Sequence, residues 1–396
     1  MTEYRISDKM VDMKPSAIRE IFKSLSDPEI IAFAAGNPAP ESFPVKAISA
    51  FSEEIFRDRP VQALQYSITE GYPALRDAVK RRLRDRFHTG TENDDTIIVS
   101  GGQQGIELTA KVLCNEGDVV ICEEPSFIGA LNGFRSVGAV PVGVPLEEDG
   151  ISLPLLEKAL RENPRAKLLY LIPSFQNPAG LTMSLEKRRA VYDLALRYNV
   201  VILEDNPYGE LRFAGEDVPT IKSMDTEGIV CYCGSFSKIL SAGIRVGFLC
   251  APKPLLQKIV VAKQVEDVHT NIFFQMICER FMNAFDCNAH IAKVAKLYGH
   301  KCGLMIDALE QYLPEGVTFT RPQGGLFLWL TLPDTVSVPE LVSRALEKKV
   351  AVVPGSAFSC DPTKETHSIR LNYSTPSDEQ ITRGVRILSD VIRSMM

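Results

Sequence analysis

The 396-residue sequence has no long apolar run, few histidines and no excess of positive charge. About 18 consecutive apolar residues are needed to cross a bilayer, so the lack of such a run argues against a membrane span. The opening residues MTEYRISDKM have no apolar signal-peptide core, which leads us to expect a cytoplasmic protein. Lys and Arg number 44 against 50 Asp and Glu, and this formal charge of −6 argues against nucleic-acid binding.

The nine cysteines are scattered and odd in number, which favours reduced, mostly buried thiols over a disulfide framework. Cys231 and Cys233 are the closest pair and would share one face of a strand. No further ligand accompanies them, and the five histidines show no ligand spacing. The sequence therefore gives no basis for a metal site.

Short β-rich runs alternate with helical patterns from about residue 96 onward, as is typical of α/β folds. The runs are TIIVS, DVVICE, KLLYLIP, VVILED, IVCYCG and RVGFLC. They are continuously apolar, which is expected of parallel strands covered by helices on both faces. After about residue 251 the pattern changes to longer helices, the strand LFLWLTL, a helix near 339–349, VAVVPG, SIRLNYS and a last helix. We therefore expect a large domain with a mostly parallel central sheet and a smaller α+β domain.

Three segments are predicted within this organisation. Residues 1–44 would form an N-terminal helix and a Gly/Pro-rich substrate loop, residues 45–285 the large domain, and residues 286–396 the small C-terminal domain. In the first segment, Ile18, Ile21, Phe22 and Leu25 follow a helical spacing that leaves Arg19 on a different face.

Candidate functional residues follow the strands, because ligands of such a sheet lie at the carboxyl ends of its strands. Lys238 in GSFSKILSAGIRVG follows one run, and Ser235, Ser237 and Arg245 around it supply hydroxyls and a guanidinium suited to a phosphate. Taken alone, Lys238 fits a surface lysine better. Asp205, at the end of VVILED, is either a helix cap or a functional carboxylate.

Two further segments are weaker signals. Asn177 in IPSFQNPAG fits a simple turn as well as a binding residue. The glycines of VSGGQQG, between a strand and a helix, could expose amides to a phosphate, although a lone Gly-rich turn is a weak indication.

The order GGQQG, PSF, QNP, DNPY, SFSK, an arginine and then SIRLNYS resembles the fold-type I pyridoxal-phosphate (PLP) enzymes, specifically class I/II aminotransferases. The resemblance covers essentially the whole chain and implies an α/β fold of the PLP-dependent transferase type. The phrases SAIREIF, FAAGNPAPESFP, LQYSITEGYPALR and PSFQNPAG are most similar to the 2-aminoadipate/kynurenine aminotransferase branch.

The resemblance implies a role for each candidate residue. Lys238 would bind PLP covalently and act as general base, Asp205 would pair with the ring nitrogen, and Phe127 would stack on the ring. The complete implied cofactor set is Gly102, Gln103, Phe127, Asn177, Asp205, Tyr208, Ser235, Ser237, Lys238 and Arg245, with Tyr66 reaching in from a neighbouring subunit. A homodimer with shared active sites follows from that last assignment.

The implied substrate residues are Arg370, Asn177, Gly36 and Arg19. Arg370 in SIRLNYS would clamp the α-carboxylate with its planar fork, and Arg19 would contact a distal carboxylate. The branch more often has Tyr at position 127, Gly at 35 and Leu at 37, where this sequence has Phe127, Ala35 and Asn37.

The activity implied is transfer of an amino group from an L-amino acid to a 2-oxo acid, with 2-oxoglutarate as acceptor and a ping-pong mechanism. Candidate donors are 2-aminoadipate, glutamate, branched and aromatic amino acids. Two alternatives share the cofactor: another PLP reaction such as β-elimination, and a PLP-sensing transcriptional regulator, which would need a DNA-binding domain.

Overall fold

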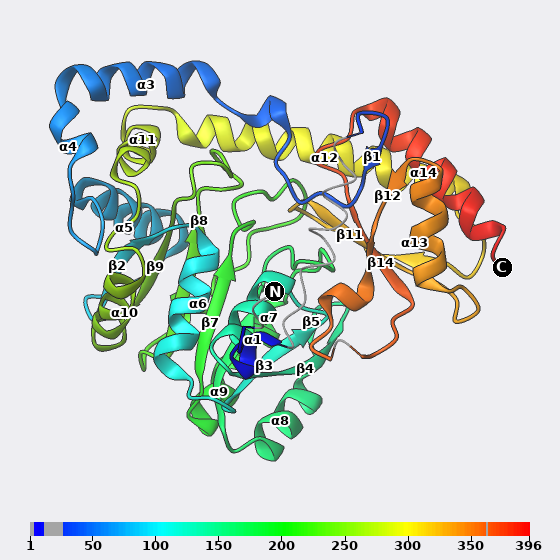
Figure 1. The fold of residues 1–396 in the computed structure, drawn as a ribbon, viewed down its shortest axis with the longest axis horizontal. Coiled ribbons are helices and arrows are strands. Elements are labelled where there is room, and N and C mark those ends of the chain that lie inside the picture. The colour runs from blue at the N-terminus through cyan, green and yellow to red at the C-terminus, as the bar shows by residue number, and fades with distance from the viewer. Residues whose placement is uncertain (1–3, 12–26, 362) are drawn as a thin grey trace.

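The computed structural model describes residues 4–11, 27–361 and 363–396, so the predicted N-terminal helix with Arg19 lies outside the described residues. The described chain is built around an eight-stranded sheet and a four-stranded sheet. The long helix α12 (Cys287–Tyr312) runs from above the large sheet to the small one, as Figure 1 shows. The boundary at residues 285/286 stays a prediction.

The large sheet confirms the expected α/β architecture. Its order is β2 (Asp94–Val99), β9 (Gly247–Pro252), β8 (Val230–Ser235), β7 (Val201–Asn206), β6 (Ala166–Leu171), β3 (Val119–Glu124), β4 (Val140–Glu147) and β5 (Gly150–Ile151). All six predicted runs are strands, and pairing is parallel from β8 through β7, β6 and β3 to β4.

The six apolar runs were interpreted as parallel strands, and this is wrong for one of them. Strand β9 (the run RVGFLC) is antiparallel to both of its neighbours. The connection from β8 to β9 covers residues 236–246 and contains no crossover helix. A parallel return needs a dozen or more residues, so this short connection forces the antiparallel direction. The start of β9 consequently lies at the same edge as the ends of β2 and β8.

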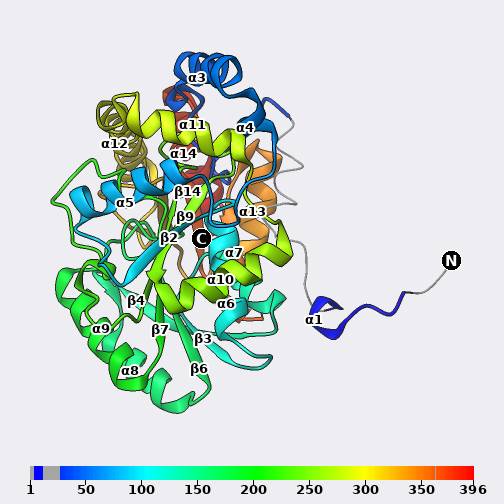
Figure 2. The same cartoon turned by 90° about the vertical axis from the view of Figure 1, so that its left-hand side faces the viewer.

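Helices cover both faces of the large sheet. Figure 2 shows α6 (Gly102–Leu113) and α10 (Lys253–Glu266) on one face and α8 (Leu153–Glu162) and α9 (Leu185–Tyr198) on the other. The surrounding helices are α5 (Pro73–Phe87), α7 (Ile128–Ser136) and α11 (Ile272–Asn283). Strand residues facing both layers are fully buried, for example Leu168 and Leu169, which explains the continuous apolar runs.

The small sheet has the order β10 (Thr318–Phe319), β11 (Phe327–Thr331), β14 (Ser368–Asn372) and β13 (Val353–Pro354), with antiparallel pairing throughout. It packs with α13 (Val338–Glu347) and α14 (Asp378–Arg393). Strand β1 (Ile31–Ala32) pairs in parallel with β12 (Val350–Ala351), so the segment leading to Gly36 is attached to this smaller unit.

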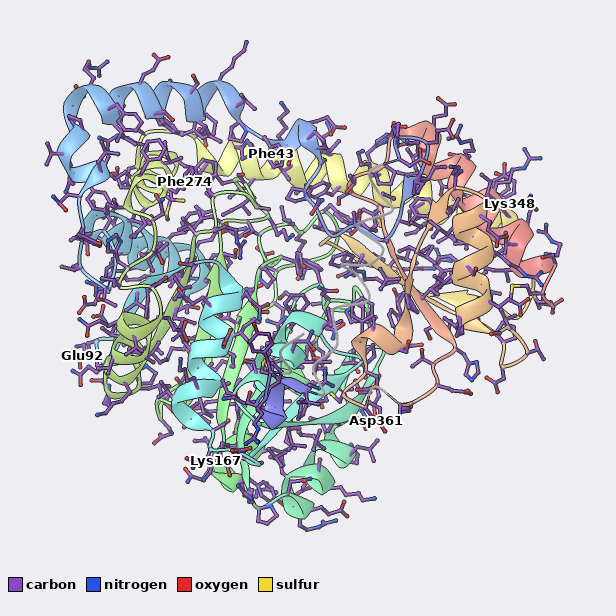
Figure 3. The ribbon with its side chains drawn as sticks, in the orientation of Figure 1. Phe43, Glu92, Lys167, Phe274, Lys348 and Asp361 are labelled. Atoms are coloured by element: carbon purple, nitrogen blue, oxygen red, sulfur yellow. The ribbon has the colours of Figure 1, made fainter. Side chains whose placement is uncertain are left out.

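The remaining elements lie along the chain's N-terminal part and in connections: α1 (Asp8–Val11), η1 (Pro40–Ser42), α3 (Val45–Asp58), α4 (Pro60–Leu64), η2 (Lys222–Met224) and η3 (Gly355–Phe358). Phe43, just before α3, lies beside α12 (Figure 3). Among the described helices, none combines the length and apolar character needed to cross a membrane.

Candidate active site

A cavity of about 430 Å³ lies at the carboxyl edge of the large sheet, within the size range of small-molecule sites. Strands β2, β3, β6, β7 and β8 all end at this edge, and each is followed by a predicted functional residue. All ten cofactor residues predicted from within one chain line the cavity, together with Gly36 and Arg370. The large sheet supplies the cofactor residues, whereas Gly36 and Arg370 come from the smaller unit, so the cavity joins residues up to 334 positions apart in the sequence.

The Lys238 amine is half-buried in this cavity, and its Nζ donates a hydrogen bond to the Gly36 carbonyl oxygen at 2.7 Å. Burial lowers the pKa of Lys238 to about 8, and the positive charges of Arg370 and Arg245 act in the same direction. A sizeable fraction of the amine is therefore neutral near pH 8. A neutral amine is the form that attacks carbonyl groups and accepts protons.

Asp205, at the end of β7, is a buried carboxylate whose Oδ2 accepts a hydrogen bond from the Tyr170 hydroxyl at 2.7 Å. Burial raises the pKa of Asp205 to about 7, whereas the Tyr170 hydrogen bond opposes the shift. Among the described residues, Asp205 has no cationic partner within ion-pair distance. A protonated nitrogen of a bound ring would supply that missing charge.

An anion-binding turn lies at the start of α6. Gly101 precedes the helix with φ +81°, a conformation that favours glycine, and Gly102 and Gln103 begin the helix and line the cavity. Arg245 Nη1 donates to Ser237 Oγ at 3.3 Å, and Ser235 lines the same region. Free amides at a helix N-terminus, two hydroxyls and a guanidinium form a suitable site for a phosphate dianion.

Gly101 also makes room for the Arg245 side chain. A Cβ atom at position 101 would lie 2.2 Å from Arg245 Nη2, closer than atoms can approach without displacement. Arg245 itself has a positive φ of 53°. The guanidinium therefore depends on a glycine at this turn for its position beside the helix start.

Arg370, on β14 of the small sheet, is a buried cation that lines the cavity. Its Nη1 donates to Asn177 Oδ1 at 3.0 Å and its Nη2 to the Ala34 carbonyl oxygen at 2.9 Å, while its buried Nε has no partner. The guanidinium also lies 4.1 Å from the Phe327 ring centre. Within the described chain no carboxylate pairs with it, so a substrate carboxylate would complete its charge balance.

The aromatic residues of the site occupy two positions. Tyr208 is buried, and its ring meets Phe327 edge-on at 5.8 Å. Phe127, just before α7, lines the cavity on another side. A Cβ atom at Gly129 would lie 2.4 Å from Phe127 Cζ, so the glycine at 129 allows the ring to lie where it does.

Among the described residues, one predicted site residue does not line the cavity of its own chain. Tyr66 is 81% exposed and does not line the cavity of its own chain. Its ring makes an edge-to-face contact with the His269 ring, with 5.9 Å between the ring centres. Arg19 lies outside the described residues. No cluster of His, Cys, Asp or Glu suited to a metal ion occurs among the residues with assigned positions.

The structure adds two residues that we did not predict from the sequence. Tyr170 contacts Asp205 from near the end of β6, and the Phe327 ring, on β11, lies against the Arg370 guanidinium. Both belong to apolar strand patterns, KLLYLIP and LFLWLTL, in which an aromatic residue signals only a strand. Their functional position depends on which strands are neighbours.

Residues 28–388 match the family model described as aminotransferase class I and II, which spans most of the chain. The chain belongs to this aminotransferase family. This result confirms the predicted family, the fold type and the assignment of the protein as a PLP-dependent aminotransferase.

The aminotransferase has relatives of similar length. It is 38% identical to an aromatic-amino-acid aminotransferase of Thermococcus litoralis, over 100% of this chain and 95% of that protein. It is also 38% identical to the 2-aminoadipate transaminase of Thermus thermophilus, over 97% of this chain and 95% of that protein. Among solved structures, the kynurenine aminotransferase of Pyrococcus horikoshii superposes with a TM-score of 0.94 at 36% identity, covering 98% of this chain and 97% of the other.

Proposed function

We propose that this aminotransferase binds PLP in the cavity at the carboxyl edge of the large sheet and transfers an amino group from an L-amino acid to 2-oxoglutarate by a ping-pong mechanism. The observation that carries the proposal is that Lys238 and Asp205 line one cavity together with an anion-binding turn and the buried cation Arg370.

The cavity offers three features that fit PLP. The turn at Gly102 with Arg245 suits its phosphate, Asp205 is a buried carboxylate that lacks a cation, and Lys238 is an amine of lowered pKa. When bound, PLP supplies an electrophilic aldehyde and a protonated ring that accepts the electron pair released at the substrate Cα.

The protein residues would bind, orient and move protons. Arg370 would hold the substrate α-carboxylate through its free Nε and its fork, with Asn177 fixing the guanidinium. Lys238 Nζ would take the proton from the substrate Cα. Asp205 would keep the ring nitrogen protonated, and Phe127 would cover one face of the ring.

Tyr208 and Asn177 would donate hydrogen bonds to the phenolic oxygen of the cofactor, as the resemblance implies. Tyr208 is buried and borders the cavity beside Phe327. Asn177 already accepts from Arg370 through Oδ1, which leaves its amide nitrogen available as a donor. This arrangement supports one asparagine serving both the cofactor and the substrate clamp.

A homodimer forms part of the proposal, because Tyr66 and other large apolar side chains of α3, α4 and α10 are exposed. They are Phe56, Val61, Leu64, Val261 and Val265. Large exposed apolar side chains are often covered in protein interfaces. A second copy of the chain would cover them, and Tyr66 would then reach the phosphate site of the partner.

The donor substrates proposed are 2-aminoadipate, glutamate, and branched or aromatic amino acids. The relatives named for aromatic amino acids, 2-aminoadipate and kynurenine support donors with large side chains. Phe327 and Asn37 line the cavity and offer one apolar and one polar contact for such a side chain. A reducing, cytoplasmic location is proposed because the cysteines are all unpaired thiols.

A half-reaction panel tests the proposed function. PLP-loaded enzyme is mixed with single amino acids, and the visible absorbance, 2-oxo acid and ammonia are measured. We expect a 2-oxo acid without ammonia, and the amino group recovered as glutamate after 2-oxoglutarate is added. Release of ammonia and pyruvate would instead indicate β-elimination, and sequence-specific DNA binding without turnover would indicate a regulator.

A further inference from the structure

A fully buried lysine lies directly behind the turn at the start of α6. Lys263, in α10, is 0% exposed, and its Nζ donates to Gln104 Oε1 and Thr270 Oγ1, both at 2.9 Å. The same Nζ contacts the two carboxylate oxygens of Asp267 at 2.8 and 2.9 Å. A buried ammonium is tolerated when its protons are all bonded and its charge is paired, and both conditions are met here.

Asp267 and Gln104 connect this lysine to Ser100, the residue before Gly101. Asp267 Oδ2 accepts from Ser100 Oγ and from Gln104 Nε2, each at 2.8 Å. Gln104 Oε1 accepts from the Ser100 backbone N–H at 2.8 Å. Ser100 is therefore held through its main chain and its side chain at the same time.

The turn that Ser100 begins needs such support. A glycine can adopt more backbone conformations than other residues, so Gly101 alone does not fix the turn. It lies between Ser100 and the amides of Gly102 and Gln103 that line the cavity. Arg245 Nη2 in turn donates to the Ser100 carbonyl oxygen at 3.5 Å. A shift of Ser100 would therefore move both the amides and the guanidinium of the anion site.

We propose that Lys263, Asp267 and Gln104 form a positioning cluster that fixes the phosphate-binding turn of this aminotransferase. None of the three needs to touch the cofactor phosphate, since the cluster acts through Ser100. The cluster holds the Gly102 and Gln103 amides and Arg245 in one arrangement, so that phosphate binding need not order them. This inference rests on the proposed function, because it assumes a phosphate-bearing cofactor at the turn.

The test compares two cofactor forms in cofactor-free enzyme. Dissociation constants of PLP and of pyridoxal, which lacks the phosphate, are measured for wild type, Lys263→Met and Asp267→Asn. We expect the variants to bind PLP about 10- to 100-fold more weakly, by analogy with the loss of metal affinity when groups that orient metal ligands are removed. Pyridoxal binding should stay within about twofold of wild type, because it makes no contact with the turn.

A matched control is Lys301→Met, which also removes a buried lysine, one that donates to the Pro376 carbonyl oxygen at 2.6 Å in the smaller unit. It should leave both dissociation constants unchanged. Should Lys263→Met fail to fold, Ser100→Ala is the second variant. It removes the hydroxyl contacts with Asp267 and Thr270 but keeps the backbone hydrogen bond to Gln104, so it should show a smaller loss that is again confined to PLP.

The outcomes separate this inference from the proposed function. If the variants bound PLP and pyridoxal more weakly by the same factor, the cluster would have only a structural role. If PLP binding were unchanged, the turn would keep its conformation without the cluster. Either result overturns the positioning role while the half-reaction of wild type stands. A wild type that binds PLP no better than pyridoxal would overturn the phosphate site itself.

Discussion

The Tyr170 hydroxyl donates a hydrogen bond to Asp205 at 2.7 Å inside the core of the large sheet. Asp205 is thereby stabilised as an anion against the burial that raises its pKa to about 7. The pair explains how a carboxylate surrounded by apolar strands can remain charged enough to hold a proton on a cofactor ring. It leads to two predictions about pH.

Tyr170→Phe removes the donor, so the pKa of Asp205 should rise further. We expect the acidic limb of the kcat/KM profile to move to higher pH by about one to two units, since a hydrogen bond to a charged group contributes about 1.5–3 kcal/mol and one pKa unit corresponds to about 1.4 kcal/mol. The control is Tyr192→Phe, which removes a hydroxyl bonded to the buried Asp225. This control variant should be less stable but should keep the wild-type pH profile of kcat/KM. An unchanged acidic limb in Tyr170→Phe would show that Tyr170 does not affect the pKa of Asp205.

Asp205→Asn should stabilise the cofactor-free protein while it impairs catalysis. The folded pKa of about 7 lies above the unfolded value of about 4, so folding stability falls as pH rises between these values. Removing the charge should recover up to about 4 kcal/mol at pH 8 and much less at pH 5. Denaturant unfolding of both proteins at the two pH values measures this. A variant destabilised equally at both pH values would contradict it.

The lowered pKa of Lys238 leads us to expect that the rate of covalent PLP binding depends on pH. Its pKa is lowered to about 8 by burial, Arg370 and Arg245, so the neutral fraction grows about tenfold per unit below pH 8. The rate at which cofactor-free enzyme gains the absorbance of covalently bound PLP should follow that fraction and level off above pH 8. Lys238→Ala should show no such absorbance and no transamination. A rate independent of pH between 6 and 8 would argue against a neutral-amine nucleophile.

Gly101→Ala should weaken cofactor binding through steric displacement of Arg245. The new Cβ would lie 2.2 Å from Nη2, and φ +81° is unfavourable for alanine. A strain of about 1–3 kcal/mol corresponds to a roughly 5- to 150-fold increase in the PLP dissociation constant. Gly303→Ala is the matched control, because nothing lies within 4 Å of its added Cβ on α12. The control should bind PLP normally and gain about 0.5–1 kcal/mol of stability.

The sequence was sufficient to predict the residues that follow strands. Asp205 lies at the end of an apolar run, Asn177 and Lys238 follow such runs within a few residues, and the strand order brings all three to one edge. Strand β4 was not among the predicted runs because Pro141 and Pro145 interrupt its pattern, which is tolerated near the edge of a sheet. The antiparallel direction of β9 was also missed, since the apolar pattern of a strand carries no direction.

The residues that support the site were beyond prediction for a different reason. Tyr170 and Phe327 look like ordinary strand residues, and Lys263 looks like one charge among several on α10. Their roles come from contacts with partners that are far apart in the sequence, such as Lys263 with Gln104. Local pattern fixes which residues are buried, whereas only the packed fold decides what a buried polar group contacts.

Tyr66 gives the last prediction, because it is exposed on its own chain and absent from its own cavity. If it completes the partner's phosphate site, Tyr66→Ala should weaken PLP binding in the homodimer, and Lys238→Ala should be inactive. Unfolding and refolding an equal mixture of the two variants would form hybrid dimers. In each hybrid, one site combines the intact Lys238 of the first subunit with the intact Tyr66 of the second.

Half of the dimers formed at random would be hybrids, so about one site in four should regain native behaviour. At a PLP concentration that saturates wild type but not Tyr66→Ala, the mixture should exceed the activity averaged over the two parent proteins. Refolded single variants serve as controls for losses on refolding. Activity that only equals the parental average would mean that Tyr66 serves no neighbouring site, even if the chain dimerises.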